Sequence, residues 1–270
     1  GIEWLKRYQA EQVRLLQRAE KKEEFDTKGS ADNLDAFIYM ILAEEKLNND
    51  EMQRFLYRDR LNLSVYGMCL YGIGLDSVGA KEKLAMVRKN IEQYLVQDDE
   101  NQTAYLRLPE NTWWWCWYGG DVETMAWYLK LLARVEPKGQ TASRLVKYLL
   151  NNRRHGTYWN STRDTAYCIE AMAEYIKNSG ESKPDMEVEV LLDGKSVKKV
   201  KIDKDNLFTF DNKFVLTGKD VTDGEHAVTL RRTGTGPVYF NAYLTNFTLE
   251  DPIEKAGLEI KVTRKYYRLQ

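Results

Sequence analysis

Four segments in the first two thirds of the chain carry apolar residues at three- and four-residue steps. They span residues 31–45, 62–75, 121–134 and 161–177, and an Asp32-Asn33 start signal precedes the first stripe. This spacing places the apolar side chains on one face of a helix, and it predicts four largely buried helices. The apolar positions are Leu34, Phe37, Ile38, Ile41 and Leu42; Leu63, Tyr66, Leu70 and Ile73; Met125, Tyr128, Leu129 and Leu132; and Ala166, Ile169, Met172 and Ile176.

Two more polar amphipathic helices are predicted between these segments, over residues 81–97 and 141–151. Alternation of a buried helix with a half-exposed one is typical of αα-hairpins packed side by side, in which each buried helix touches neighbours on both sides. The irregular spacing favours a curved ring of such hairpins. We therefore expect residues 1–182 to form a helical α/α toroid that is incomplete.

The helical pattern ends at a cluster of breakers between residues 178 and 184, which includes Gly180 and Pro184. Asp193-Gly194 follows, between the alternating segments 186–192 and 195–202, and accepts the positive φ angles of a type I′ hairpin turn. Further strands are predicted at residues 207–210, 214–216, 225–231 and 238–249. Short strands with frequent turns indicate an antiparallel β-sandwich, which we place at residues 183–252. Residues 253–270 are expected to add a strand or to begin a following β-domain.

The composition supports two domains and limits the partners. The 270 residues are 43% apolar, with seven Trp and seventeen Tyr, which gives enough bulk for two hydrophobic cores. A formal net charge of -1 provides no field that would attract nucleic acid or an anionic membrane. No apolar run reaches the roughly 20 residues of a membrane span, and the first residues lack the pattern of a signal peptide. We expect either a cytosolic protein or part of a longer chain.

Few residues suit catalysis or cofactor binding. Cys69, Cys116 and Cys168 lie far apart and are expected to be buried free thiols. Only His155 and His226 are present, in different predicted domains, which makes a histidine-based mechanism or metal site improbable. No glycine cluster has the spacing of a phosphate-binding loop. We therefore predict that the chain holds no cofactor and no metal.

A run of aromatic residues precedes the third apolar helix and contains Trp113, Trp114, Trp115 and Trp117. Exposed indoles on a loop could stack on sugars or bind a peptide. Equally, alternate Trp side chains could bury themselves in the mouth of the helical ring and fix the loop to it, because an aromatic ring of this size is seldom left in water.

Three carboxylates begin helices near that aromatic run: Asp121, Glu123 and Asp164. A pair of acids across a cleft is what glycoside hydrolysis requires. Acids at helix N-termini are also common caps, however. Ser161-Thr162-Arg163-Asp164 fits an S-x-x-D capping box, and Asp121 can cap its own helix.

The segment from Tyr158 to Ala166 resembles the W-x-S-T-x-D-T-A signature that opens the last thioester-domain helix of alpha-2-macroglobulins, through Trp159, Ser161, Thr162, Asp164 and Thr165. Upstream, residues 117–126 are similar to the aromatic, then acidic, then E-T-x-A stretch of bacterial members of that family. In the family the thioester domain is an α/α toroid inserted into a CUB-like β-sandwich, which corresponds to the order of parts here. Residues 257–267 are similar to the first strand of the receptor-binding-like domain.

The resemblance implies a function. Members of the family trap attacking proteases when cleavage of a bait region triggers a rearrangement, and a Cys-Gln thioester can acylate the protease. The motif Cys-Gly-Glu-Gln does not occur in this chain, so no catalytic residue is carried over. We therefore predict that this chain is part of a larger, secreted endopeptidase inhibitor of the bacterial type, which is extracellular or periplasmic. The chain is expected to have no turnover chemistry of its own. Its expected partners are proteases and other domains of the same longer chain.

Two alternatives remain open. Because α/α toroids also serve carbohydrate-active enzymes and terpene cyclases, the three carboxylates could belong to an enzyme of that type. The chain could also be a non-catalytic scaffold whose aromatic loop docks a partner protein.

Overall fold

The computed structural model describes residues 1–109, 120–154, 156, 158–181, 183–207, 209–218, 223–238, 240, 242, 243 and 245. Within these residues the chain is first helical and then forms a small antiparallel sheet, as expected for an α part followed by a β part. The chain divides into two compact units, residues 1–236 and 237–270, and every described helix and strand lies in the first. The domain boundaries predicted after residues 182 and 252 stay predictions.

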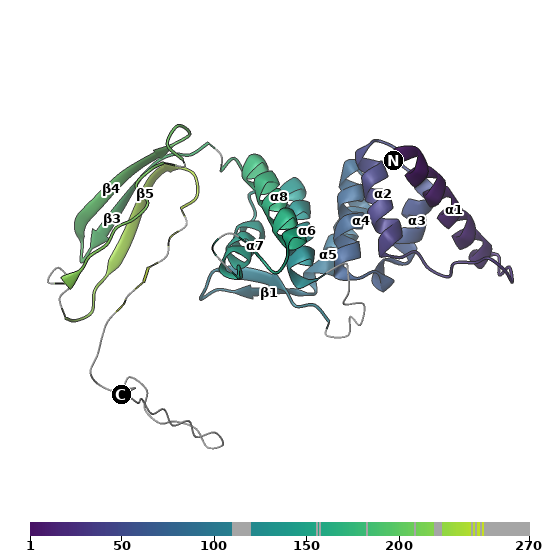
Figure 1. Ribbon diagram of the computed structural model, residues 1–270, viewed down its shortest axis with the longest axis horizontal. Helices are drawn as coiled ribbons and strands as arrows, with labels where there is room; N and C mark the ends of the chain where they lie inside the picture. The colour runs from purple at the N-terminus through teal and green to yellow at the C-terminus, as the bar shows by residue number, and fades with distance from the viewer. Residues whose placement is uncertain are drawn as a thin grey trace, which may run out of the picture. The chain divides into compact units, whose positions relative to one another are not determined.

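The six predicted helices are all present, together with two that the apolar pattern did not predict, α1 and α3. The bounds are α1 Ile2–Glu20, α2 Asn33–Glu44, α3 Asp50–Arg58, α4 Val65–Ser77, α5 Lys81–Glu92, α6 Asp121–Val135, α7 Gln140–Asn151 and α8 Thr162–Ser179, with a short 3-10 turn, η1, at Arg60–Asn62. Helices α2, α4, α6 and α8, called the inner helices below, pack against one another in that order (Figure 1). Helices α5 and α7 pack on α4 and α6. Helices α2, α4 and α6 are mostly buried, as predicted, whereas only three residues of α8 are buried.

The four inner helices run parallel to one another. Three side chains of α6 each bind a residue of α8 that lies 40 positions later in the chain: Glu123 binds Arg163, Lys130 binds Glu170 and Arg134 binds Glu174. A constant separation requires that the two helices run in the same direction. The contacts of α4 rise in the same order, from Asn33 to Tyr39 on α2 and from Trp127 to Leu131 on α6. Each inner helix is therefore followed by a connection that returns the chain to the same end of the row.

Three glycines allow α4 to approach its neighbours closely. A Cβ atom on Gly67 would lie 2.1 Å from Asn33 Oδ1, and one on Gly74 would lie 2.8 Å from the Tyr39 ring, both on α2. A Cβ atom on Gly72 would lie 3.0 Å from Leu131 of α6. The Gly72-Ile73-Gly74 sequence thus serves helix packing and is not a phosphate-binding loop.

Parallel packing aligns the helix dipoles, and basic side chains near the C-terminal ends bind carboxylate and carbonyl oxygens there. Arg134 of α6 binds Glu174 of α8 at 2.7 Å and Glu44 of α2 at 2.5 Å, so one guanidinium lies between two carboxylates near three helix ends. Lys46 donates a hydrogen bond to the carbonyl of Ser77 at the end of α4. At the opposite end, Asp32, Ser64 and Ser161 cap α2, α4 and α8.

The helix predicted over residues 81–97 is too long. Helix α5 ends at Glu92, and strands β1 (Leu95–Asp98) and β2 (Thr103–Leu106) form an antiparallel hairpin. Leu95 continues the helical spacing of the apolar residues before it, which caused the error. The chain turns where Asp98 accepts hydrogen bonds from the backbone and side chain of Asn101, and Gln102 has a φ of 52°.

The apolar stripe predicted for α8 is wrong at Ala166, Ile169 and Ile176, which are exposed, whereas Met172 packs against the core. The residues of α8 that face the core are Cys168, Ala171 and Tyr175, whereas Ile169 and Ile176 are 56% and 40% exposed. Helix α8 has apolar residues on two faces, and packing against α6 uses the less conspicuous one. By contrast, the stripes predicted for α4 and α6 are buried as expected.

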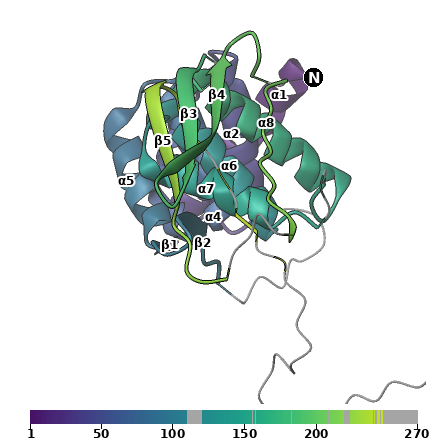
Figure 2. The same ribbon diagram turned by 90° about the vertical axis from the view of Figure 1, so that its left-hand side faces the viewer.

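Strands β3 (Asp185–Leu192), β4 (Lys195–Asp203) and β5 (Val228–Thr235) form a three-stranded antiparallel sheet with β3 in the centre (Figure 2). Asp193 and Gly194 have positive φ angles, 49° and 80°, which confirms the predicted hairpin turn. Met186, Val188 and Leu191 are buried on one side of the sheet, and Glu189 binds Lys199 and Arg231 on the other. The described strands after residue 183 form a single sheet, so the predicted sandwich is not confirmed.

The four other predicted strands differ from the structure in the residues described. Residues 207, 209 and 210 lie in turns, because the Asn206 carbonyl accepts hydrogen bonds from the backbone N–H groups of Thr209 and Phe210. Residues 214–216 are irregular, and the strand expected from residue 225 begins at Val228. Within 238–249, the described residues 238, 240, 242, 243 and 245 are not in a strand; the other residues of that range and all of 253–270 lie outside the described part.

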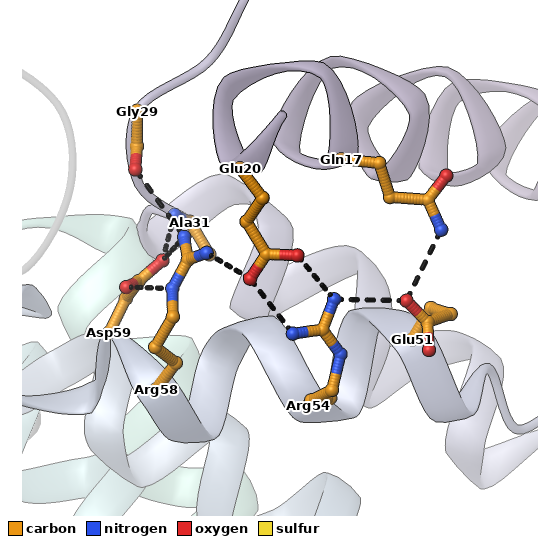
Figure 3. A network of polar contacts seen from close by, with 8 residues as sticks. All are labelled: Gln17, Glu20, Gly29, Ala31, Glu51, Arg54, Arg58 and Asp59. Atoms are coloured by element: carbon orange, nitrogen blue, oxygen red, sulfur yellow. Dashed lines mark hydrogen bonds and ion pairs between the residues drawn. The ribbon is translucent and has the colours of Figure 1, made fainter. Parts of the chain in front are cut away.

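Helix α1 is joined to α3 by a network of charged side chains (Figure 3). Glu20 of α1 accepts hydrogen bonds from both terminal nitrogens of Arg54 at 2.9 Å and from Arg58 at 2.7 Å. Arg58 also binds Asp59, whose Oδ2 accepts a hydrogen bond from the backbone N–H of Ala31. The network therefore connects the end of α1, the start of α2 and the whole of α3. None of the helices in the described residues has the length and apolar character that a membrane crossing requires.

The Glu20 carboxylate is expected to make folding acid-sensitive. Its hydrogen bond with Arg54 lowers the pKa of Glu20 from 4.5 to about 2. A lowered folded-state pKa stabilises the protein above the unfolded value and loses that contribution as pH falls through the folded value. Glu20→Gln should therefore be less stable than wild type at pH 7, and the difference should shrink as the pH falls and vanish only below about pH 2. Urea unfolding across this range would measure the convergence. Glu24→Gln, a change in the exposed loop, is the control, and it should not produce this pH-dependent difference from wild type.

Candidate functional site

The residues of the macroglobulin-like motif lie at the start of α8 and connect it to α7. Trp159 is 3% exposed, and its indole Nε1 donates a 2.8 Å hydrogen bond to the carbonyl of Leu149. Leu149 is in the last turn of α7, where carbonyl groups have no partner within the helix. The Trp159 backbone N–H donates to Thr165 Oγ1 at 3.1 Å. Trp159 therefore fixes the segment before α8 to the end of α7.

Ser161 caps α8 as its sequence predicts. Ser161 Oγ accepts a 3.0 Å hydrogen bond from the backbone N–H of Asp164, and the Thr165 hydroxyl donates to the Ser161 carbonyl at 2.8 Å. Thr162 is the first residue of the helix, and Asp164 lies in its first turn, where a carboxylate interacts favourably with the helix dipole. The contacts of this motif are those of a helix start.

The starts of α6 and α8 are joined by an ion pair whose carboxylate is buried. Glu123 of α6 is 2% exposed, and its Oε1 lies 2.5 Å from Arg163 Nη2 of α8. One turn further along, Trp127 of α6 packs against Tyr167 of α8, with ring centroids 5.3 Å apart. Lys130 lies over the Trp127 ring at 4.3 Å and binds Glu170 of α8 at 2.9 Å. Charged and aromatic contacts thus alternate along the seam between the two helices.

The predicted site residues fall into three groups. Glu123 is brought against the segment that contains Ser161, Thr162 and Asp164, through Arg163. Asp121 is exposed in the first turn of α6 but does not cap it, because the N-cap residue is Gly120 and no side chain caps this helix. The prediction that Asp121 caps α6 is therefore wrong. Trp113, Trp114, Trp115 and Trp117 lie outside the described residues.

Sequence reasoning missed Arg163, Trp127 and Lys130 as members of this seam. Arg163 occupies an unspecified position of the motif, and the other two follow the segment similar to the family. The available signal was the repeated separation of 40 residues between opposite charges, 123 to 163, 130 to 170 and 134 to 174. That separation becomes informative only when α6 and α8 are known to be parallel neighbours.

The described thiols and imidazole do not form a nucleophilic site. Cys69 and Cys168 are free and buried, as predicted, and Cys116 lies outside the described residues. Burial raises the pKa of the Cys69 thiol and raises the pKa of the Cys168 thiol to about 12, which disfavours the thiolate at neutral pH. His226 lies 2.8 Å from Asp193 at the β3–β4 turn, and this hydrogen bond lowers the pKa of Asp193. No cluster of candidate metal ligands occurs among the residues described.

Comparison of the sequence with models of known protein families gives no match, and comparison with curated proteins gives none either. The functional assignment therefore depends on the motif residues and on the helix arrangement.

Proposed function

We propose that this chain is the helical, thioester-domain-like part and the adjoining CUB-like β part of a secreted macroglobulin-like protease inhibitor. Its role is to trap an attacking endopeptidase, and its partners are proteases and other domains of the same protein, outside the cytoplasm. The observation that carries the proposal is the combination of the Trp159–Thr165 motif with a row of parallel inner helices. In this row, the motif begins the last inner helix.

The helix arrangement supports the toroid that this function implies. In an α/α toroid, inner helices run parallel around the ring and outer helices return the chain, which is the local relationship of α2, α4, α6 and α8 to α5 and α7. The motif residues support a structural role in this ring, because Trp159 and Ser161 fix the start of α8.

We propose that protease trapping uses no catalytic residue of this chain. The sequence contains no Cys-Gly-Glu-Gln, and the described thiols of Cys69 and Cys168 are buried within helices. The carbohydrate-enzyme or cyclase alternative receives less support, because Glu123 is bound to Arg163 at the seam between α6 and α8. The protein-binding scaffold alternative is favoured by one observation, the exposed apolar face of α8 that contains Ile169 and Ile176.

Capture of a protease by the whole inhibitor that contains this chain tests the proposal. The protein is incubated with less than an equal amount of a broad-specificity endopeptidase, and the mixture is separated by size-exclusion chromatography. We expect the protease to elute with the inhibitor, to cleave a small peptide substrate, and to lose activity on a large protein substrate, because enclosure excludes only the large one.

A protease whose active site has been blocked beforehand is the control. It cannot cleave a bait region and should elute alone. Failure of the active protease to co-elute in either a covalent or an enclosed form would disprove the inhibitor function. Capture of both forms alike would instead support a simple binding scaffold.

A further inference from the structure

Helix α1 is attached to the rest of the protein differently from the inner helices. Of its 19 residues, only Gln9, Val13 and Leu16 are buried, whereas in α4 the buried stretch runs without interruption from Val65 to Leu75. Helix α1 packs against α2 and α3. Its apolar contribution to the shared core is therefore small for its length, and much of its attachment is polar.

The seam beneath α1 contains buried polar atoms whose hydrogen bonding is incomplete. Gln9 Nε2 and Asp35 Oδ1 are buried and make no hydrogen bond with any residue of the described part. The other oxygen of Asp35 binds Lys28 Nζ at 2.7 Å, and Lys28 also binds Gln12 of α1 at 3.1 Å. The seam between α1 and α2 is therefore partly polar, and separation of the two helices would expose these groups to water.

The connection between α1 and α2 contains two further features that opening would relax. Lys22 and Asp26 have φ angles of 57° and 49°, a left-handed conformation that residues other than glycine rarely adopt. The connection folds back on α1 through a hydrogen bond from the Lys28 N–H to the Leu15 carbonyl. Residues 21–31 can therefore act as a hinge when this bond and the seam separate.

The end of α1 is held by the charged network of Figure 3. Glu20 binds Arg54 and Arg58 of α3, and Gln17 donates a 3.2 Å hydrogen bond to Glu51. The side chains of Arg54 and Glu20 are 44% and 37% exposed, so dissolved ions can screen their attraction. This polar link between α1 and α3 is thus one that salt weakens, unlike the apolar contacts among the inner helices.

We propose that α1 is an ionically latched arm, which opens by local unfolding while α2 to α8 stay folded. Glu20 is the latch on the arm, and Arg54 and Arg58 are its receptors on α3. Opening hydrates Asp35 and Gln9 and uncovers the apolar surface of α2 and α3 beneath Val13 and Leu16. The device is independent of protease trapping, so it does not depend on the proposed function.

Hydrogen exchange of the folded chain, read peptide by peptide by mass spectrometry, tests the latch. In wild type, we expect peptides of α1 to exchange about tenfold faster than those of α4 and α6, because α1 opens without them. Glu20→Gln should accelerate α1 exchange by a further factor of about two to five, as expected for loss of an exposed ion pair. Raising the salt concentration to about 1 M should have the same effect on wild type and little on the variant.

Glu11→Gln is the matched control. It removes the same charge from α1, but Glu11 pairs with Arg14 inside the helix and does not reach α3. Its effect on α1 exchange should be less than about twofold. Equal protection of α1, α4 and α6 in wild type would overturn the proposal, and so would unchanged α1 exchange in Glu20→Gln. An effect of Glu11→Gln as large as that of Glu20→Gln would show that the interhelix latch is not responsible.

Discussion

Trp159→Ala is expected to lower the free energy of unfolding by about 3–5 kcal/mol, the usual cost of deleting a buried tryptophan side chain. The indole is 3% exposed, and it joins α7 to the start of α8 through its hydrogen bond to the Leu149 carbonyl. Its removal creates a cavity and also leaves that carbonyl without its partner. Urea unfolding followed by circular dichroism would measure the loss.

Two further variants separate the contributions of Trp159. Trp159→Phe keeps most of the apolar volume but removes the indole N–H, and a loss of about 1–2 kcal/mol is expected. Trp4→Ala removes a tryptophan that is 57% exposed on α1, and it should change stability by no more than about 0.5 kcal/mol. A loss for Trp159→Ala as small as that for Trp4→Ala would contradict the structural role of the motif.

The sequence predicted α4 and α6 well, because their apolar stripes are wide and regular and are buried on the expected positions. The stripe predicted for α2 is only partly buried, since Leu34 is 49% exposed. α1 and α3 were not predicted: only three of the 19 residues of α1 are buried, and α3 has only nine residues. The β1–β2 hairpin was missed because its turn contains no glycine to interrupt the apolar spacing.

The orientation of α8 shows what periodicity alone does not determine. Ala166, Ile169 and Ile176 form a more hydrophobic face than Cys168, Ala171 and Tyr175, yet the second set faces the core. The choice depends on contacts with α6, where Arg163 binds Glu123 and Tyr167 packs on Trp127. These partners are distant in sequence, so a local pattern cannot identify them.

The candidate site was predictable where its bonds are local. The S-x-x-D pattern gave the cap of α8, because Ser161 and Asp164 are separated by a fixed helical distance. It did not give the Trp159–Leu149 bond or the Glu123–Arg163 pair, because each joins two different helices. The error at Asp121 arose because a residue one position later than the cap carries a similar acidic signal.

Gly74→Val should also have a large effect, a destabilisation of about 3 kcal/mol, at the upper end of the usual cost of overpacking a core. A Cβ atom at this position would lie 2.8 Å from the Tyr39 ring and 3.3 Å from the Met40 Cα atom. The ring cannot easily move away. Tyr39 is fully buried, and its hydroxyl donates to Asn48 and accepts a hydrogen bond from Gln53, each at 2.9 Å.

The added side chain must therefore push α2 and α4 apart, or break the bonds of Tyr39. Gly74→Ala should be milder, because alanine gains about 1 kcal/mol of helix propensity against a smaller clash. Gly29→Val is the control, since nothing lies within 4 Å of a Cβ atom there and its effect should stay within about 0.5 kcal/mol. Thermal and urea unfolding of the three variants would rank them. If Gly74→Val were as stable as Gly29→Val, α2 and α4 could not be in the close parallel contact on which the two-layer helix arrangement depends.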